Sequence, residues 1–200
     1  MKKTIVKTVM AASMLFSMVL GQGEGTAVAV AATSATTKAP VMTDNLFKYG
    51  LKKDVELPVT VTAGGLSYTL EKIMIYDIKS ATAQELIKKY GYGSYGKFLV
   101  WTKITIENKG NKTIEVSAND PDPKWMIGVG DGGILDQGMP SIKVREKNSK
   151  EALWSYSLKP GQKLSTYQGL FNLGSTFDYL VIWLDVKGKS GQKYIVNREE

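Results

Sequence analysis

Residues 98–107 constrain the fold of this chain more than any other segment. One side of their alternating pattern is apolar and consists of Phe98, Val100, Thr102, Ile104 and Ile106. The other side carries the polar residues Lys103, Thr105 and Glu107. Successive side chains of a β-strand point to opposite faces of the sheet, so this pattern predicts a long strand with one buried face.

Other short segments repeat this alternation and are separated by turn residues. Leu66, Tyr68 and Leu70 share one parity, whereas Ile73 and Ile75 have the opposite one, which predicts a β-bulge near residues 71–72. Further strands are expected at residues 113–116, 125–129, 152–158, 180–186 and 193–196. Turns are expected at residues 108–111, 131–133 and 160–161, and the first should return residues 113–116 against the long strand. The pattern is typical of an all-β sandwich.

A single helix is expected in residues 80–91. Ser80 is a favourable N-cap, Lys88 and Lys89 fall in the last turn, and Gly91 is a typical stop residue. The helix would be a short insertion into a domain that is otherwise built from strands.

The beginning of the chain has the three parts of a secretory signal peptide. Lys2, Lys3 and Lys7 precede an apolar run at residues 9–20, and alternating alanines at residues 27–31 resemble a cleavage site. The apolar run is shorter than the roughly 18 to 20 residues of a membrane-spanning helix. We therefore expect a signal peptide at residues 1–31, a flexible linker at residues 32–56 and one β-sandwich domain at residues 57–200.

Composition excludes several kinds of chemistry. The chain contains no histidine and no cysteine, which removes Ser-His-Asp and Cys-His catalysis, zinc sites of the usual type, disulfides and a lipid-bearing cysteine. Without residues 1–31, the chain has 23 Lys and Arg against 18 Asp and Glu, a net charge of about +5. This charge favours anionic surroundings but is too scattered to indicate nucleic-acid binding.

The order of the strand and turn motifs resembles one known family. The motifs are GLSYTL at residues 65–70, GKFLVWTKITIENKG at residues 96–110, TIEVS at residues 113–117 and LKPG at residues 158–161. They resemble the secreted telokin-like immunoglobulin-fold domains of unknown function from Gram-positive bacteria. The resemblance implies an immunoglobulin-like β-sandwich and supplies no catalytic residues. This chain departs from the family pattern at residues 81–95, where the helix and a tyrosine-glycine segment are inserted.

The inserted segment provides the first candidate ligand-binding residues. Residues 91–96 match G-x-G-x-x-G, but a helix precedes them and a strand follows, the reverse of a dinucleotide site. Tyr90, Tyr92 and Tyr95 combine rigid aromatic area with flexible glycine, as recognition loops do. The alternative is a connecting loop without a binding role.

Two tryptophans extend this list of candidates. Trp101 and Trp183 each lie opposite the apolar side of their strand, so each is expected on an outer sheet face. Exposed aromatic rings there would bind sugar rings or a protein partner. The alternative is that the linker or the inserted helix covers them.

Charged residues supply two weaker candidates. Lys143, Arg145 and Lys147 alternate and would share one face of a strand, as a basic binding surface or as protection of a sheet edge. Asp120, Asp122 and Asp131 are candidate calcium ligands without a complete loop signature, and turn formation also explains them.

Together these features predict a non-enzymatic binding module at or near the bacterial cell envelope. We expect a secreted, extracellular protein with at most a loose, non-covalent association with the wall. Its partner would be a protein or an anionic wall polymer, with no cofactor and no nucleic acid. The alternatives are a carboxylate-dependent hydrolase of wall glycans and a structural surface or matrix component.

Overall fold

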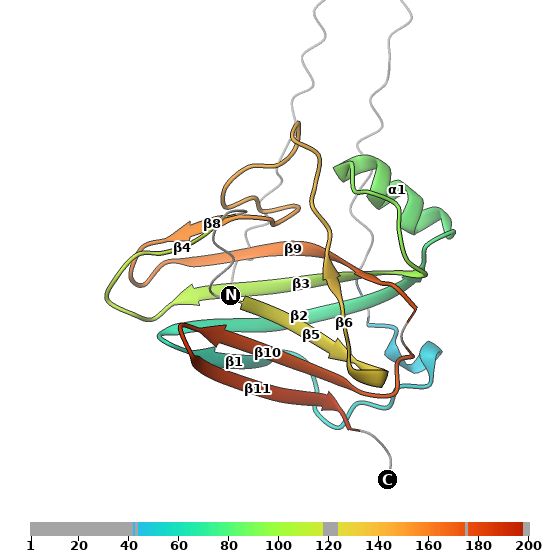
Figure 1. Cartoon of the computed structure of the whole chain (residues 1–200), viewed down its shortest axis with the longest axis horizontal. Helices are drawn as coiled ribbons and strands as arrows, with labels where there is room; N and C mark the ends of the chain where they lie inside the picture. The colour runs from blue at the N-terminus through green and yellow to red at the C-terminus, as the bar shows by residue number, and fades with distance from the viewer. Residues whose placement is uncertain (1–41, 43, 118–123, 175, 198–200) are drawn as a thin grey trace, which may run out of the picture. The chain divides into compact units, whose positions relative to one another are not determined.

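The long strand expected at residues 98–107 is β3 (Phe98–Asn108), the middle strand of a five-stranded antiparallel sheet (Figure 1). The computed structural model describes residues 42, 44–117, 124–174 and 176–197, which belong to one compact unit, Ala39–Glu200. The predicted signal peptide therefore lies outside the described residues.

Two sheets and a short ladder make up the fold, which confirms the all-β prediction. The large sheet has the order β1 (Val59–Ala63), β2 (Leu66–Asp77), β3, β9 (Lys163–Asn172) and β7 (Asp136–Gln137). The small sheet has the order β11 (Lys189–Val196), β10 (Leu180–Val186), β5 (Lys124–Val129) and β6 (Gly133–Ile134). A two-stranded ladder pairs β4 (Ile114–Val116) with β8 (Tyr156–Leu158).

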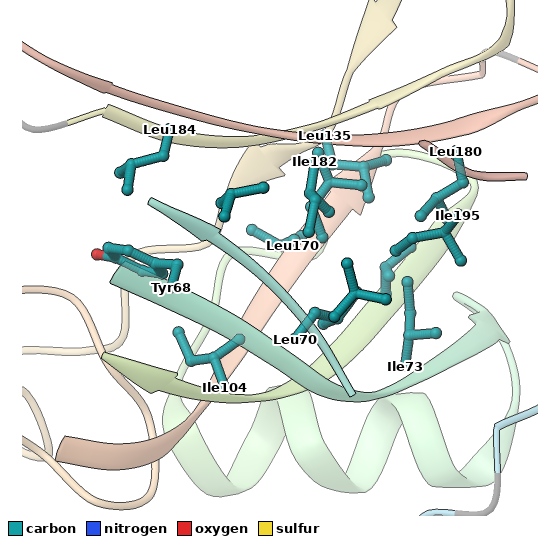
Figure 2. Close-up of a cluster of buried hydrophobic side chains, with 14 of the residues drawn as sticks. Tyr68, Leu70, Ile73, Ile104, Leu135, Leu170, Leu180, Ile182, Leu184 and Ile195 are labelled. Carbon is teal, nitrogen blue, oxygen red and sulfur yellow. The ribbon is translucent and has the colours of Figure 1, made fainter. Parts of the chain in front are cut away.

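The inner faces of the two sheets share one apolar core (Figure 2). The large sheet contributes Leu70, Ile73, Ile104 and Leu170, and the small sheet contributes Leu180, Ile182, Leu184 and Ile195. These side chains come from the apolar sides of their strands, so the predicted parity of β3 and β10 is correct. The predicted bulge is also present, because the pairing of β2 with β3 shifts between Leu70 and Lys72.

Two predicted local elements are confirmed at their expected positions. Helix α1 (Ala81–Tyr90) begins at Ser80, whose Oγ accepts a hydrogen bond from Ala83 N at 3.3 Å. It ends at Gly91, which adopts a left-handed conformation with φ of 64°. The turn expected at residues 131–133 is formed by the 3-10 helix η2 (Gly130–Gly132), which connects β5 with β6 as a hairpin.

The segment before β1 is part of the domain rather than a linker. Leu46, the first residue of the 3-10 helix η1 (Leu46–Tyr49), and Leu51, which follows this helix, both lie in the core. Asn45 Nδ2 donates to Ile75 O at 2.6 Å, and Ile75 N donates to Asn45 Oδ1 at 2.7 Å. The predicted linker at residues 32–56 is therefore wrong for its described part, because that part supplies core side chains and satisfies backbone groups of β2.

The predicted hairpin at residues 108–111 is wrong. Strand β4 pairs with β8 and not with β3. The physical reason is the buried side chain of Asn108, whose Nδ2 donates to Lys112 O and Leu158 O at 2.8 Å each. Its Oδ1 accepts from Gly110 N at 3.0 Å, so the chain turns away from the large sheet.

Strand β9 is an element that the sequence pattern did not indicate. Its core-facing side places Thr166 and Gln168 between Leu164 and Leu170, which interrupts the apolar alternation. Thr166 Oγ1 donates to Ser149 O at 2.6 Å, so this hydroxyl is satisfied inside the fold. The strand expected at residues 152–158 is present only as β8, near its end.

Candidate functional site

The outer face of the small sheet carries a shallow groove beside Trp183. We call it the Trp183 groove and define it by Met126, Trp183, Ser190, Gly191 and Gln192. Its volume is about 600 Å³. Strand pairing places Met126 and Gln192 directly opposite Trp183, on β5 and β11 respectively. Three neighbouring strands therefore build one surface, which the order β11–β10–β5 brings together.

The Trp183 indole lies along the sheet surface over Gly128. A Cβ atom on Gly128 would lie 2.5 Å from Cζ3 and 2.8 Å from Cη2 of the ring, so only glycine leaves the indole this position. Trp183 Nε1 donates to Gln192 Oε1 at 2.5 Å, which fixes the orientation of the ring. Trp183 is half-buried. The sheet thus holds an aromatic ring in one orientation at its surface.

Further aromatic and basic residues lie near the Trp183 groove. Tyr194 is exposed on β11, opposite Val181, and its ring is 6.4 Å from that of Tyr179. Lys189 and Lys193 are exposed on the same edge strand. Asp185 lies opposite Ser190, and its Oδ1 accepts from Gly188 N at 3.3 Å in the hairpin turn.

The Trp183 groove combines an apolar surface with hydrogen-bonding groups. An indole ring offers an apolar face, and the Gln192 amide and Ser190 hydroxyl offer hydrogen-bonding groups at its side. A mainly apolar surface with a few polar groups is the usual composition of a ligand site. Within the described part of the chain, no three acidic residues are grouped as a metal site requires.

Of the two predicted outer-face tryptophans, only Trp183 reaches the surface. Trp101 is 2% exposed because α1 covers that face of the large sheet. Its ring stacks on Tyr90 at 5.3 Å and on Tyr167 at 5.8 Å. The prediction of an exposed Trp101 is therefore wrong, and the alternative that the inserted helix covers it is correct.

The three candidate tyrosines of the inserted segment also differ in exposure. Tyr90 and Tyr92 are buried against the large sheet, and burial raises the pKa of both phenols. Lys89 opposes the effect at Tyr90, where its Nζ lies 4.9 Å from the ring centroid. Tyr95 is 39% exposed and stacks on Phe171 at 4.4 Å. Only Tyr95 thus retains exposed ring area, so Tyr90 and Tyr92 do not form a surface contact site.

The basic candidates do not lie on a strand. Val144 N and Arg145 N both donate to Ser141 O, at 3.1 and 3.0 Å, so residues 142–144 form a turn. The predicted common face is wrong because a turn does not alternate its side chains. Lys143 and Arg145 line a cleft of about 550 Å³, whereas Lys147 forms an ion pair with Glu115 at 2.6 Å.

The calcium candidates remain a prediction. Asp120 and Asp122 lie outside the described residues, and the backbone of Asp131 lies in η2.

No helix in the described ranges combines the length and apolar character that a bilayer crossing requires.

Sequence patterns missed the residues around Trp183. Ser190, Gln192 and Tyr194 alternate along β11, and Lys187-Gly188 has the positive φ angles of a two-residue hairpin turn. Reading this turn together with the alternation would have placed Gln192 opposite Trp183. Met126 becomes a neighbour only through the pairing of β5 with β10, which is not local in sequence.

Comparison with known proteins assigns no family. No family model matches the chain, and no curated protein matches it. Two solved structures from Bacillus subtilis are similar to it. The yjhA protein is 13% identical, with a TM-score of 0.42 over 64% of this chain and 80% of that one. The ycdA protein is 10% identical, with a TM-score of 0.41 over 70% of this chain and 39% of that one.

Proposed function

We propose that this protein is a secreted, non-enzymatic binding module that holds an anionic wall polymer at the bacterial cell envelope. The observation that carries the proposal is the Trp183 ring, held over Gly128 beside a groove of about 600 Å³. The ligand chemistry that fits this surface is a sugar-containing polymer with negative charges.

The aromatic ring supports the sugar component of the ligand. One face of a sugar ring presents C–H groups, which pack on the negatively polarised face of an indole. Gln192 already orients the indole, so little conformational entropy is lost when a ligand packs against it. Ser190 is exposed at the groove and offers a hydroxyl to the ligand.

The surrounding charge supports the anionic component. Lys189 and Lys193 are exposed on edge strand β11, opposite Val186 and Ile182, so they flank the groove residues Ser190 and Gln192 in sequence and point to the other face of the strand. Neither has a carboxylate within ion-pair distance among the described residues, so both add to the positive potential around this edge of the sheet. The net charge of about +5 expected for the chain without residues 1–31 adds long-range attraction toward a polyanion.

We also propose that the domain is an immunoglobulin-like sandwich of the telokin-like type. Two antiparallel sheets that share one core support this classification. The inserted helix α1 covers the outer face of the large sheet, so the small sheet is the one that presents an outer aromatic face.

Co-sedimentation with purified cell walls tests the binding function. Trp183→Ala should weaken binding at least tenfold, and the pair Lys189→Gln and Lys193→Gln should weaken it severalfold at low salt only, because exposed charges are screened by salt. Ser190→Trp is a second variant that fills the groove and leaves the core intact. The matched charge control is Lys52→Gln with Lys79→Gln. Unchanged binding by the Trp183 and Ser190 variants would contradict the proposal.

Two further measurements separate the alternatives. The protein recovered from culture medium should begin between Val30 and Thr33, and a retained Met1 in a membrane fraction would contradict secretion. Walls incubated with the protein should release no soluble fragments. Release of glycan fragments would instead support the carboxylate-dependent hydrolase, and capture only of an envelope protein would point to a protein partner.

A further inference from the structure

An exposed apolar turn projects from the loop at residues 139–147, which we call the apex loop. Ile142 is 80% exposed, the largest exposed fraction among the large apolar side chains that the structure describes. Met139 and Val144, in the same loop, are also exposed. Figure 1 shows the chain between β6 and β8 rising to a projecting tip next to α1. Water therefore surrounds an apolar tip that contributes nothing to the core.

Hydrogen bonds hold the apex loop in place. Ser141 N donates to Tyr90 O at 2.9 Å, which anchors the loop to the last turn of α1. Ser141 O accepts from Val144 N and Arg145 N, which closes the turn. A Cβ atom on Gly91 would lie 2.5 Å from Ser141 Cβ, so the helix end and the loop are in close contact. The exposed tip is thus a built feature of the fold.

Basic side chains surround this apolar tip. Lys143, Arg145 and Lys150 line the adjacent cleft and have no carboxylate within ion-pair distance among the described residues. Arg145 is only half-exposed, and Nη1 contacts Met139 Sδ at 2.7 Å.

The other charged groups of the cleft are largely paired. Lys89 is paired with Glu151 at 3.2 Å, and Lys147 beside the cleft is paired with Glu115. The remaining acidic group, Glu146, is exposed. The unpaired charges at this cleft are mainly positive.

We propose that the apex loop docks on the surface of an anionic lipid bilayer. Ile142 enters the boundary between headgroups and acyl chains, flanked by Met139 and Val144. Lys143, Arg145 and Lys150 then face the lipid phosphates. Peripheral membrane binding is strengthened by apolar insertion and by basic residues near the headgroups, and the loop supplies the two together.

The apolar tip favours a bilayer over a soluble polyanion. A polyanion would be attracted by the cations alone and would leave Ile142 in water. A bilayer removes Ile142 from water at the same position where the basic residues meet the headgroups. The Trp183 groove belongs to the small sheet and takes no part in this contact, so the proposal does not rest on the function proposed above.

Co-sedimentation with lipid vesicles tests this proposal on the protein recovered after signal-peptide removal. Vesicles of phosphatidylcholine with phosphatidylglycerol should bind it, and vesicles of phosphatidylcholine alone should bind it much more weakly. Ile142→Ser should weaken binding to the mixed vesicles about tenfold. Lys143→Gln with Arg145→Gln should weaken it by more, since each basic residue near an anionic surface typically strengthens binding about fivefold. Both sets of substitutions lie at exposed or half-exposed positions, so folding should be retained.

Matched controls separate this surface from others. Phe47→Ser removes a 72% exposed apolar side chain from η1, and Trp183→Ala removes the groove; neither should change vesicle binding. No vesicle binding, or binding that Ile142→Ser leaves unchanged, would overturn the proposal. A third outcome is that only the Lys143 and Arg145 variant loses vesicle binding and that soluble polyphosphate displaces the protein from the vesicles. This outcome would show a site for polyanions in general and would also overturn the proposal.

Discussion

The indole of Trp183 occupies the space that any side chain at position 128 would need. Its Cζ3 lies 2.5 Å from where a Cβ atom on Gly128 would be, and its Nε1 donates a hydrogen bond to Gln192 Oε1. The exposed aromatic surface of the small sheet therefore depends on a residue on the neighbouring strand.

Gly128→Ala should displace the Trp183 ring. We expect a loss of about 1–3 kcal/mol of stability, as for other over-packing changes. Wall binding should fall together with it, because the ring no longer lies along the sheet. Urea unfolding and wall co-sedimentation measure the two effects. Gly93→Ala is the matched control, because its Cβ would have no neighbour closer than 3.5 Å. A Gly128 variant with native stability and native binding would show that the ring position is unimportant.

Trp101→Ala should act on stability, in contrast to Trp183→Ala. Its ring is buried between Tyr90 and Tyr167, so the truncation should remove about 3–5 kcal/mol from the free energy of unfolding. Denaturant titration measures the loss. Trp101→Phe, which retains much of the buried area, should lose less. Loss of wall binding with unchanged stability in Trp101→Ala would instead mean that this ring contacts the ligand.

Asn45→Ala should destabilise the domain although Asn45 belongs to no strand. The substitution removes the Asn45 partner of Ile75 N, and a buried N–H without its partner is destabilising, whereas Ile75 O keeps the hydrogen bond from Tyr49 Oη at 3.0 Å. We expect a loss of about 1–3 kcal/mol. The melting temperature provides the measurement, with the exposed Lys52→Ala as the control. Equal melting temperatures for the two variants would show that the hydrogen bonds of Asn45 contribute little to stability.

Stability should fall at alkaline pH. Tyr68 is fully buried, and burial raises the pKa of its phenol well above the ordinary 10.0; its OH donates to Tyr156 OH at 2.9 Å. Burial also raises the pKa of Tyr92. The folded state therefore retains phenol protons that the unfolded state loses near pH 10. The contribution of these buried phenols to the free energy of unfolding is complete below about pH 10 and is lost progressively above it.

Melting temperatures measured from pH 9 upward test this expectation. Tyr68→Phe should flatten the decline, and the exposed Tyr194→Phe should leave it unchanged. A melting temperature that stays constant through this range would contradict the assignment.

The local elements of this protein follow from short stretches of sequence. Ser80 and Gly91 determine the ends of α1, because a capping hydroxyl and a left-handed glycine act on neighbouring backbone groups. The change of parity after Leu70 indicates the bulge, and the parity of β10 places Trp183 on the outer face. These features depend on residues within a few positions of one another.

Only the tertiary structure decides which surfaces remain exposed and which strands pair. Trp101 and Trp183 have equivalent sequence patterns, yet α1 covers Trp101 and leaves Trp183 at the surface. The turn after β3 resembles a hairpin in sequence. In the structure, the distant carbonyl of Leu158 accepts a hydrogen bond from Asn108 Nδ2, and β4 pairs with β8. Met126 joins the Trp183 groove only through strand pairing. Such outcomes depend on contacts between residues far apart in the chain, and local alternation carries no information about those contacts.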